Sequence, residues 1–226
     1  MRKKRHSSAY DGNENKIDSI LSDVNHQIVK ETVPHIPGWI HTHHLTAFTF
    51  LWAIVVLIGG YLSKYNIYWV WLAIIGVVGH IVTDGLDGAV GRHRKTGLVR
   101  WGYYADHFGD FLLNGSIFTS FKLINGRLNE YLIIFLIILS SGFFVHSFLA
   151  TTTLRKFTLT FLKLFSPLEG QISIVFLYLS ILIFGKDSLL VSLPIFAAIG
   201  VPILGYTVIR TLIKLWTMDR PRFPED

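Results

Sequence analysis

Long apolar runs separated by short polar segments dominate the hydropathy pattern of this 226-residue chain. Each of six runs is about as long as a bilayer-spanning helix requires, which is roughly 20 residues. The six runs lie near residues 45–63, 67–86, 103–121, 131–150, 171–184 (beginning near Ser166) and 188–210. The pattern predicts an all-α fold, a polytopic membrane protein with six transmembrane helices.

A different periodicity precedes the first run, and it is typical of an amphipathic helix. Six apolar residues recur there at helical spacing before two prolines: Ile17, Ile20, Leu21, Val24, Ile28 and Val29. Such a helix lies on the membrane surface or packs on the protein's own cytosolic loops. We therefore expect three parts: a basic cytosolic N-terminal segment with this helix (1–43), a six-helix membrane domain (44–212) and a cytosolic tail (213–226).

Basic residues are divided unevenly between the two sides of these runs. Of the 21 Lys and Arg residues, seventeen lie in the N-terminal segment, in the loops after the second and fourth runs and in the tail. The positive-inside rule then predicts that both termini are cytoplasmic. The net charge of +6 suits an anionic lipid surface better than nucleic acid. The sequence has no cysteine, which excludes disulfides and cysteine-ligated metals.

Four aspartates stand out in the stretch DGLDGAVGRHRKTGLVRWGYYADHFGD, residues 84–110. Asp84 and Asp87 are spaced i, i+3, and Asp106 and Asp110 are spaced i, i+4, so each pair shares one helix face. A short cytosolic loop joins the two helices, so both pairs reach the same side of the membrane. Such carboxylates cannot all stay ionised without a cation, because like charges repel. Hard oxygen ligands favour Mg²⁺, Mn²⁺ or Ca²⁺, and carboxylate-bound Mg²⁺ is usually shared with substrate phosphates.

The residues between the two pairs supply what a phosphate ligand needs. Glycines allow a close backbone approach, while Arg92, Arg94, Lys95 and Arg100 supply positive charge. No Walker A motif is present. The competing interpretation is a solvated basic loop whose aspartates cap helices. It accounts for an aspartate at a helix start, but not for Asp110, which lies a further turn inside.

The same stretch resembles the signature of the CDP-alcohol phosphotransferases, D-x2-D-G-x2-A-R-x8/9-G-x3-D-x3-D. Seven of the eight fixed positions match, and Gly91 stands where the family has alanine. The resemblance implies an enzyme of phospholipid synthesis that displaces CMP from a CDP-linked alcohol with a second, lipid or polar, alcohol. It also implies a homodimer. The implied ligands of two divalent ions, Mg²⁺ or Mn²⁺, are Asp84, Asp87, Asp106 and Asp110.

The resemblance also assigns roles to single residues. Asp110 is the expected general base that takes the proton of the attacking hydroxyl. Six residues are expected to bind the cytidine diphosphate: Asp84, Asp87, Gly88, Gly91, Arg92 and Gly102. Outside the motif, His80 lies one turn before Asp84 and can hydrogen-bond a ligand carboxylate.

Two short features favour the choline/ethanolamine branch of this family, with diacylglycerol as the acceptor. DHFGD, around His107, resembles that branch's DHGCD, and FSPLEG (165–170) resembles its FSGP-x-EG. His107, Arg155 and Glu169 are then candidate contacts of the acceptor or head group. The alternative within the family is CDP-diacylglycerol-dependent transfer to inositol, glycerol phosphate or serine.

Two alternatives lie outside this chemistry. Intramembrane carboxylates also line cation transporters, but such residues are spread through the depth of the bilayer, whereas these cluster at one face. An inactive member that keeps the fold is the other alternative, and Gly91 is the one motif position that suggests it.

Overall fold

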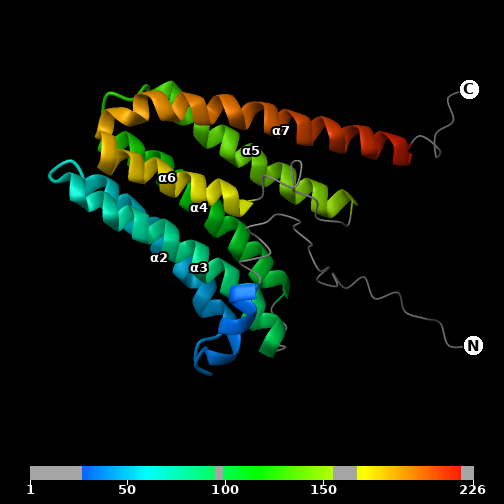
Figure 1. The fold of residues 1–226 in the computed structure, drawn as a ribbon. Coiled ribbons are helices and arrows are strands. Elements are labelled where there is room, and N and C mark those ends of the chain that lie inside the picture. The colour runs from blue at the N-terminus through cyan, green and yellow to red at the C-terminus, as the bar shows by residue number, and fades with distance from the viewer. Residues whose placement is uncertain (1–26, 95–98, 155–166, 220–226) are drawn as a thin grey trace, which may run out of the picture.

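The structure, a computed structural model, describes residues 27–94, 99–154 and 167–219. Helices are the only regular elements in these residues (Figure 1). After a helical segment at 27–32, the elements are η1 (Val33–His35), α2 (Thr42–Leu62), η2 (Ile67–Trp69), α3 (Val70–Arg94), α4 (Val99–Ile124), α5 (Glu130–Leu154), α6 (Pro167–Phe184), η3 (Lys186–Ser188) and α7 (Leu189–Asp219).

Four helical segments are long and apolar enough to cross a membrane: Thr42–Leu62, Ile67–Arg94, Glu130–Ala150 and Lys186–Met218. The apolar part of α6, Leu168–Phe184, is shorter. α4 is more polar, since it carries Asp106 and Asp110 within its predicted span. Many large apolar side chains are exposed along these helices, as lipid-facing residues are. The predicted all-α membrane fold is confirmed, and the count of six crossings stays a prediction.

Three helices are longer than the hydropathy pattern indicated. α3 continues to Arg94 and α4 begins at Val99, so Gly88, Gly91 and Gly102 lie inside helices instead of in the expected loop. A glycine costs only about 1 kcal/mol in a helix, which packing readily outweighs. α7 continues to Asp219, past the boundary expected at 212. It also accommodates two prolines, Pro194 and Pro202, within its length.

The described end of the N-terminal segment packs on the protein itself. Val29 and Val33 form an apolar cluster with Leu45 of α2 and Val90 of α3. Of the two placements considered for the amphipathic helix, this part therefore favours packing over an independent position on the membrane surface. The remainder of the helix, residues 17–26, lies outside the described residues.

α2 makes the most extensive helix–helix contacts in the described structure. It packs against both α3 and α4; α3 also contacts α6, α4 contacts α5, and α5 contacts α7. Figure 1 shows α2 and α3 on one side of the molecule and α5 and α7 on the other, with α4 and α6 between them. The largest fully buried side chains in this core include Phe118, Phe121 and Tyr178.

Small residues let α2 approach both neighbours closely. A Cβ atom on Gly59 would lie 2.6 Å from the backbone nitrogen of Ala73 in α3, and one on Gly60 would lie 2.5 Å from the Cβ of Ser120 in α4. Membrane helices commonly pack through small residues in this way, because no hydrophobic effect drives them together inside the lipid.

We expect Gly60→Ala to destabilise the protein by about 1–3 kcal/mol, the usual cost of overpacking. The added methyl group would meet the Cα of Ser120 at 2.8 Å as well as its Cβ, and backbone cannot move aside as a flexible side chain can. Thermal unfolding in detergent measures the effect. Gly115→Ala in α4 is the matched control, since its Cβ would meet nothing within 4 Å. Equal melting temperatures for the two variants would contradict the close α2–α4 contact.

Candidate active site

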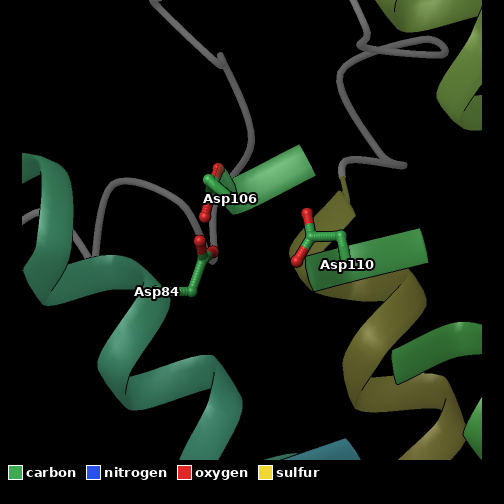
Figure 2. Close-up of side chains that lie close together, drawn as sticks. All are labelled: Asp84, Asp106 and Asp110. Atoms are coloured by element: carbon green, nitrogen blue, oxygen red, sulfur yellow. The ribbon is translucent and has the colours of Figure 1, made fainter. Parts of the chain in front are cut away.

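Three of the four motif aspartates converge between α3 and α4. One carboxylate oxygen from each of Asp84, Asp106 and Asp110 lies within 4.8 Å of the other two, and all three residues are half-buried. In Figure 2 the carboxylates of Asp84 and Asp106 face each other, while Asp110 reaches toward them from the next turn of α4. The predicted convergence of the two pairs is therefore observed for these three residues.

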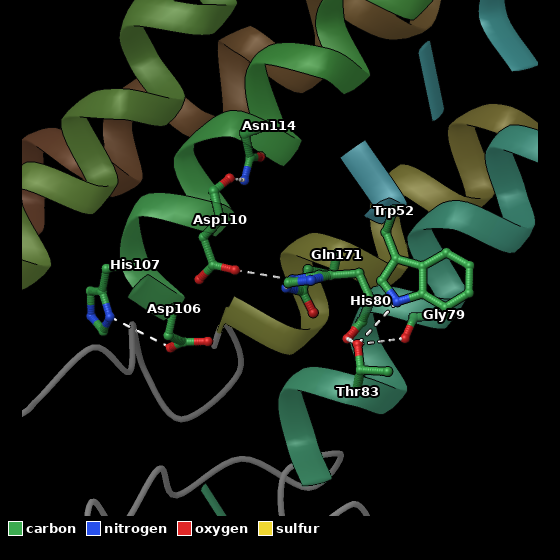
Figure 3. Close-up of polar contacts among 9 residues, drawn as sticks. All are labelled: Trp52, Gly79, His80, Thr83, Asp106, His107, Asp110, Asn114 and Gln171. Carbon is green, nitrogen blue, oxygen red and sulfur yellow. Dashed lines mark hydrogen bonds and ion pairs between the residues drawn. The ribbon is translucent and has the colours of Figure 1, made fainter. Parts of the chain in front are cut away.

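Packing on α2 places the two aspartate-bearing segments opposite each other. Thr49 of α2 lies so close to Gly109 that a Cβ there would be 2.7 Å from the threonine methyl carbon. On the other flank, Trp52 Nε1–H donates to Thr83 Oγ1 at 3.1 Å, and the indole ring covers Gly79 (Figure 3). Thr83 and Gly109 directly precede Asp84 and Asp110. The contacts of α2 thus fix both backbones beside the carboxylates.

Asp87 lies apart from the cluster and is held by α2. It is 6% exposed, and the hydroxyl of Thr46 donates to its Oδ2. Its other oxygen, Oδ1, is buried and has no hydrogen-bond partner in the described part of the chain. A buried carboxylate oxygen without a partner is costly. The four-carboxylate site expected from the sequence is thus three close carboxylates with a fourth, separately anchored one.

Two histidines contact the clustered aspartates (Figure 3). His80 of α3 is fully buried, and its Nε2 lies 3.1 Å from Oδ1 of Asp110. The residue therefore contacts a motif carboxylate as expected, but on α4 instead of on its own helix. His107 Nδ1 lies 3.5 Å from Oδ2 of Asp106.

The other predicted nucleotide-binding residues lie on the helix ends beside the cluster. Arg92 is exposed and folds back over Gly88, where a Cβ atom would lie 3.1 Å from one guanidinium nitrogen. Gly91 is half-buried in the same turn of α3. Gly102, in α4, has open space on its Cβ side. Open space is thus present at Gly102, whereas the Arg92 side chain lies over Gly88.

Of the two remaining predicted contacts of the acceptor, one lies in a helix and the other lies outside the described residues. Glu169 lies in the first turn of α6 and is half-buried, and its carbonyl accepts from Ser173 Oγ at 2.8 Å. Arg155, the other predicted contact of the acceptor, lies outside the described residues, as does Lys95.

Arg94, in the last turn of α3, contacts the segment before α2. Its guanidinium donates to the carbonyl oxygens of Ile36 at 2.8 Å and Pro37 at 3.0 Å, and also to that of Ile40. The side chain therefore ties the segment before α2 to the end of α3. Its donors are directed to these carbonyls, so Arg94 supplies its positive charge at the end of α3 while it holds the segment before α2.

The donor set fits a hard divalent cation. Ligands on opposite sides of a Mg²⁺ ion at about 2.1 Å lie roughly 4.2 Å apart, and the three oxygens all lie within 4.8 Å of one another. The donors of the cluster are carboxylate oxygens alone, which suits Mg²⁺ or Mn²⁺ better than a softer metal. Asp84, Asp106 and Asp110 would hold the ion, and the role of Asp87 as a ligand stays a prediction.

Two contacts of the site were not predicted from the sequence. Thr46 and Gln171 lie in apolar runs of α2 and α6, far along the chain from the motif. Gln171 lies 91 residues from His80, and its Nε2 is 3.1 Å from the ring nitrogen Nε2 of that residue. An isolated amide in an otherwise apolar run was the available signal, but it does not indicate a partner.

We expect Mn²⁺ to stabilise the folded protein, by about 2.7 kcal/mol at a free concentration 100 times its Kd. Asp84→Asn should abolish most of this shift. Without metal, the same variant should be more stable than wild type, because one of three mutually repelling carboxylates is removed. Thermal unfolding with and without Mn²⁺ measures both effects. Asp187→Asn is the control, since Asp187 pairs with Arg127 at 3.1 Å, away from the cluster. An unchanged Mn²⁺ shift in Asp84→Asn would contradict a metal site here.

Comparison with known protein families gives one match. The family model described as CDP-alcohol phosphatidyltransferase matches residues 35–213, which include all four motif aspartates. Comparison with curated proteins and with solved structures gave no match. Because the family model covers well over half of the chain, the protein belongs to the CDP-alcohol phosphatidyltransferase family.

Proposed function

We propose that this protein uses divalent metal ions to transfer a substituted phosphate from a CDP-alcohol to the hydroxyl of an acceptor alcohol, with release of CMP. Membership of the family supports a phosphotransferase of phospholipid synthesis. The observation that carries the proposal is the convergence of Asp84, Asp106 and Asp110 between α3 and α4. Such a cluster is unfavourable unless a cation and a phosphate ligand use it.

Different residues around the cluster are proposed to bind different parts of the donor substrate. Asp84, Asp106 and Asp110 would hold the divalent ion, whose positive charge would offset the negative charge of the pyrophosphate and of the departing CMP. Arg92, exposed at the end of α3, is available to donate to a phosphate oxygen. The open side of Gly102 leaves room for a nucleotide against the backbone of α4.

Asp110 is the proposed general base. It lies one turn deeper in α4 than Asp106, and His80 contacts one of its two oxygens. The other oxygen accepts the proton of the acceptor hydroxyl. The hydroxyl oxygen forms a bond to the phosphorus that carries the substituent, while the bond from that phosphorus to the bridging oxygen breaks. CMP leaves with the electron pair of the broken bond, and the product is a phosphodiester.

We favour an aminoalcohol, choline or ethanolamine, as the group carried by the donor, and diacylglycerol as the acceptor. Gln171 contacts His80, so the first turns of α6 lie beside the proposed base. Glu169 lies in the same turns, and its carboxylate suits a cationic head group. His107, next to Asp106, is the second residue that supports this branch.

Incubation of the purified protein with CDP-choline, CDP-ethanolamine and CDP-diacylglycerol separately, each with Mg²⁺ and candidate acceptors, tests the substrate. We expect CMP release from one of the first two, only when diacylglycerol is present. CMP release from CDP-diacylglycerol instead would reject the aminoalcohol assignment while keeping the reaction class. No release from any donor would reject the function.

We expect Asp110→Asn to lower kcat by about 10²–10⁴-fold, the usual contribution of a general base. EDTA should abolish the wild-type activity, and Mg²⁺ or Mn²⁺ should restore it. Asp187→Asn again serves as the control and should keep full activity. Wild-type turnover by folded Asp110→Asn protein would exclude Asp110 as the base.

A further inference from the structure

His80 is a buried residue whose polar contacts all lie at one end of its ring. The residue is fully buried, and its Nδ1 has no hydrogen-bond partner in the described part of the chain. Its Nε2 has two neighbours at 3.1 Å: Oδ1 of Asp110 in α4 and the side-chain amide of Gln171 in α6. Three helices thus meet at a single ring nitrogen.

The surroundings of the ring determine which nitrogen carries the proton. A proton on Nδ1 would be a buried donor without an acceptor, which is unfavourable. A proton on Nε2 faces the carboxylate of Asp110, the strongest acceptor within reach. With its proton on Nε2, His80 makes a close electrostatic contact with Asp110 Oδ1, which has no hydrogen-bond partner in the described part of the chain. The amide of Gln171 complements this donor when its carbonyl oxygen faces the ring, an orientation reached by rotating the amide through 180°.

We infer that His80 is a positioning residue for Asp110, and that Gln171 fixes the imidazole from α6. The inference rests on the proposed function for its effect on turnover, but not for its effect on metal binding. With Oδ1 engaged by His80, the carboxylate of Asp110 cannot rotate freely, and its second oxygen is directed for use by a metal ion or an acceptor hydroxyl. Partners that orient a ligand in this way typically contribute 10- to 100-fold to metal affinity or activity.

The contact with Gln171 gives this arrangement a second consequence. α3 packs against α6, and Gln171 lies two residues after Glu169. A shift of the first turns of α6 therefore moves the amide that supports His80, and through the ring it changes the orientation of Asp110.

Mn²⁺ binding to the purified protein, followed by the electron paramagnetic resonance signal of free Mn²⁺, tests the inference without any substrate. His80→Leu keeps the volume and removes the donor, and we expect it to weaken Mn²⁺ binding about 10- to 100-fold. His80→Gln places an amide N–H near the position of Nε2 and should recover most of the affinity. His146→Leu is the matched control, because it removes another buried histidine, on α5, and should bind Mn²⁺ as wild type does.

Turnover provides the second readout. At saturating Mn²⁺, His80→Leu should lower kcat and leave the KM for the CDP-alcohol unchanged, because His80 orients Asp110 and does not touch the nucleotide. Gln171→Leu should show the same pattern with a smaller change, and it keeps the test decisive if His80→Leu does not fold. A positioning role would be overturned by wild-type Mn²⁺ affinity in His80→Leu or, if that variant does not fold, in Gln171→Leu.

Two further outcomes would also overturn it. One is equal loss of Mn²⁺ affinity in His80→Leu and His146→Leu, which would indicate a general effect of removing a buried histidine. The other is no recovery in His80→Gln. Failure of the wild-type protein to release CMP from any CDP-alcohol would reject the proposed function alone, because the Mn²⁺ affinities of the variants would still decide the role of His80.

Discussion

The separation of the three clustered carboxylates depends on how closely α2 packs against its two neighbours. α3 and α4 carry the aspartates, and both lie against α2, which approaches them through Gly59 and Gly60 and through Gly79 and Gly109 of the partner helices. A single methyl group at these positions would meet atoms at 2.5–2.7 Å. The chemistry between α3 and α4 is therefore set by packing against a third helix that contributes no aspartate to the cluster.

This arrangement brings three half-buried carboxylates together in helices, away from the water that would otherwise solvate their charge. Acidic residues are costly in membrane helices and are retained mainly for function. In the described structure two side chains contact these carboxylates: Thr46 donates to Asp87, and His80 Nε2 lies 3.1 Å from Asp110 Oδ1. Each contact involves one oxygen of its carboxylate, so the other oxygen is left for a cation.

Much of the site could be predicted from the sequence because its residues lie within one stretch of 27 positions. Helical spacing places Asp106 and Asp110 on one face, and the short connection between helices brings Asp84 opposite them. The ends of the helices were harder to predict. Gly88, Gly91 and Gly102 are typical of a loop in sequence, but in the structure they lie within α3 and α4. The same extension of α3 places Arg94 in its last turn, where the guanidinium donates to backbone carbonyls of the segment before α2.

Contacts between residues far apart in the chain could not be predicted from the sequence. Thr46 and Gln171 lie in apolar runs that show only that a helix is present, and the rotation of each helix about its axis decides which polar residue faces the aspartates. Hydropathy does not determine this rotation when a helix is apolar on all sides, as α2 and α6 nearly are. The rotation is instead fixed by close packing of small residues against the neighbouring helices.

The central claim is that the aspartates of α3 and α4 bind divalent metal ions. Anomalous X-ray scattering at the manganese edge, from crystals of the protein grown with Mn²⁺, tests this claim most directly, because it locates the metal without any assumption about activity. We expect the anomalous peaks to lie among the carboxylates of Asp84, Asp106 and Asp110. Crystals with well-ordered α3 and α4 but no peak at these residues, or with peaks only elsewhere, would contradict it.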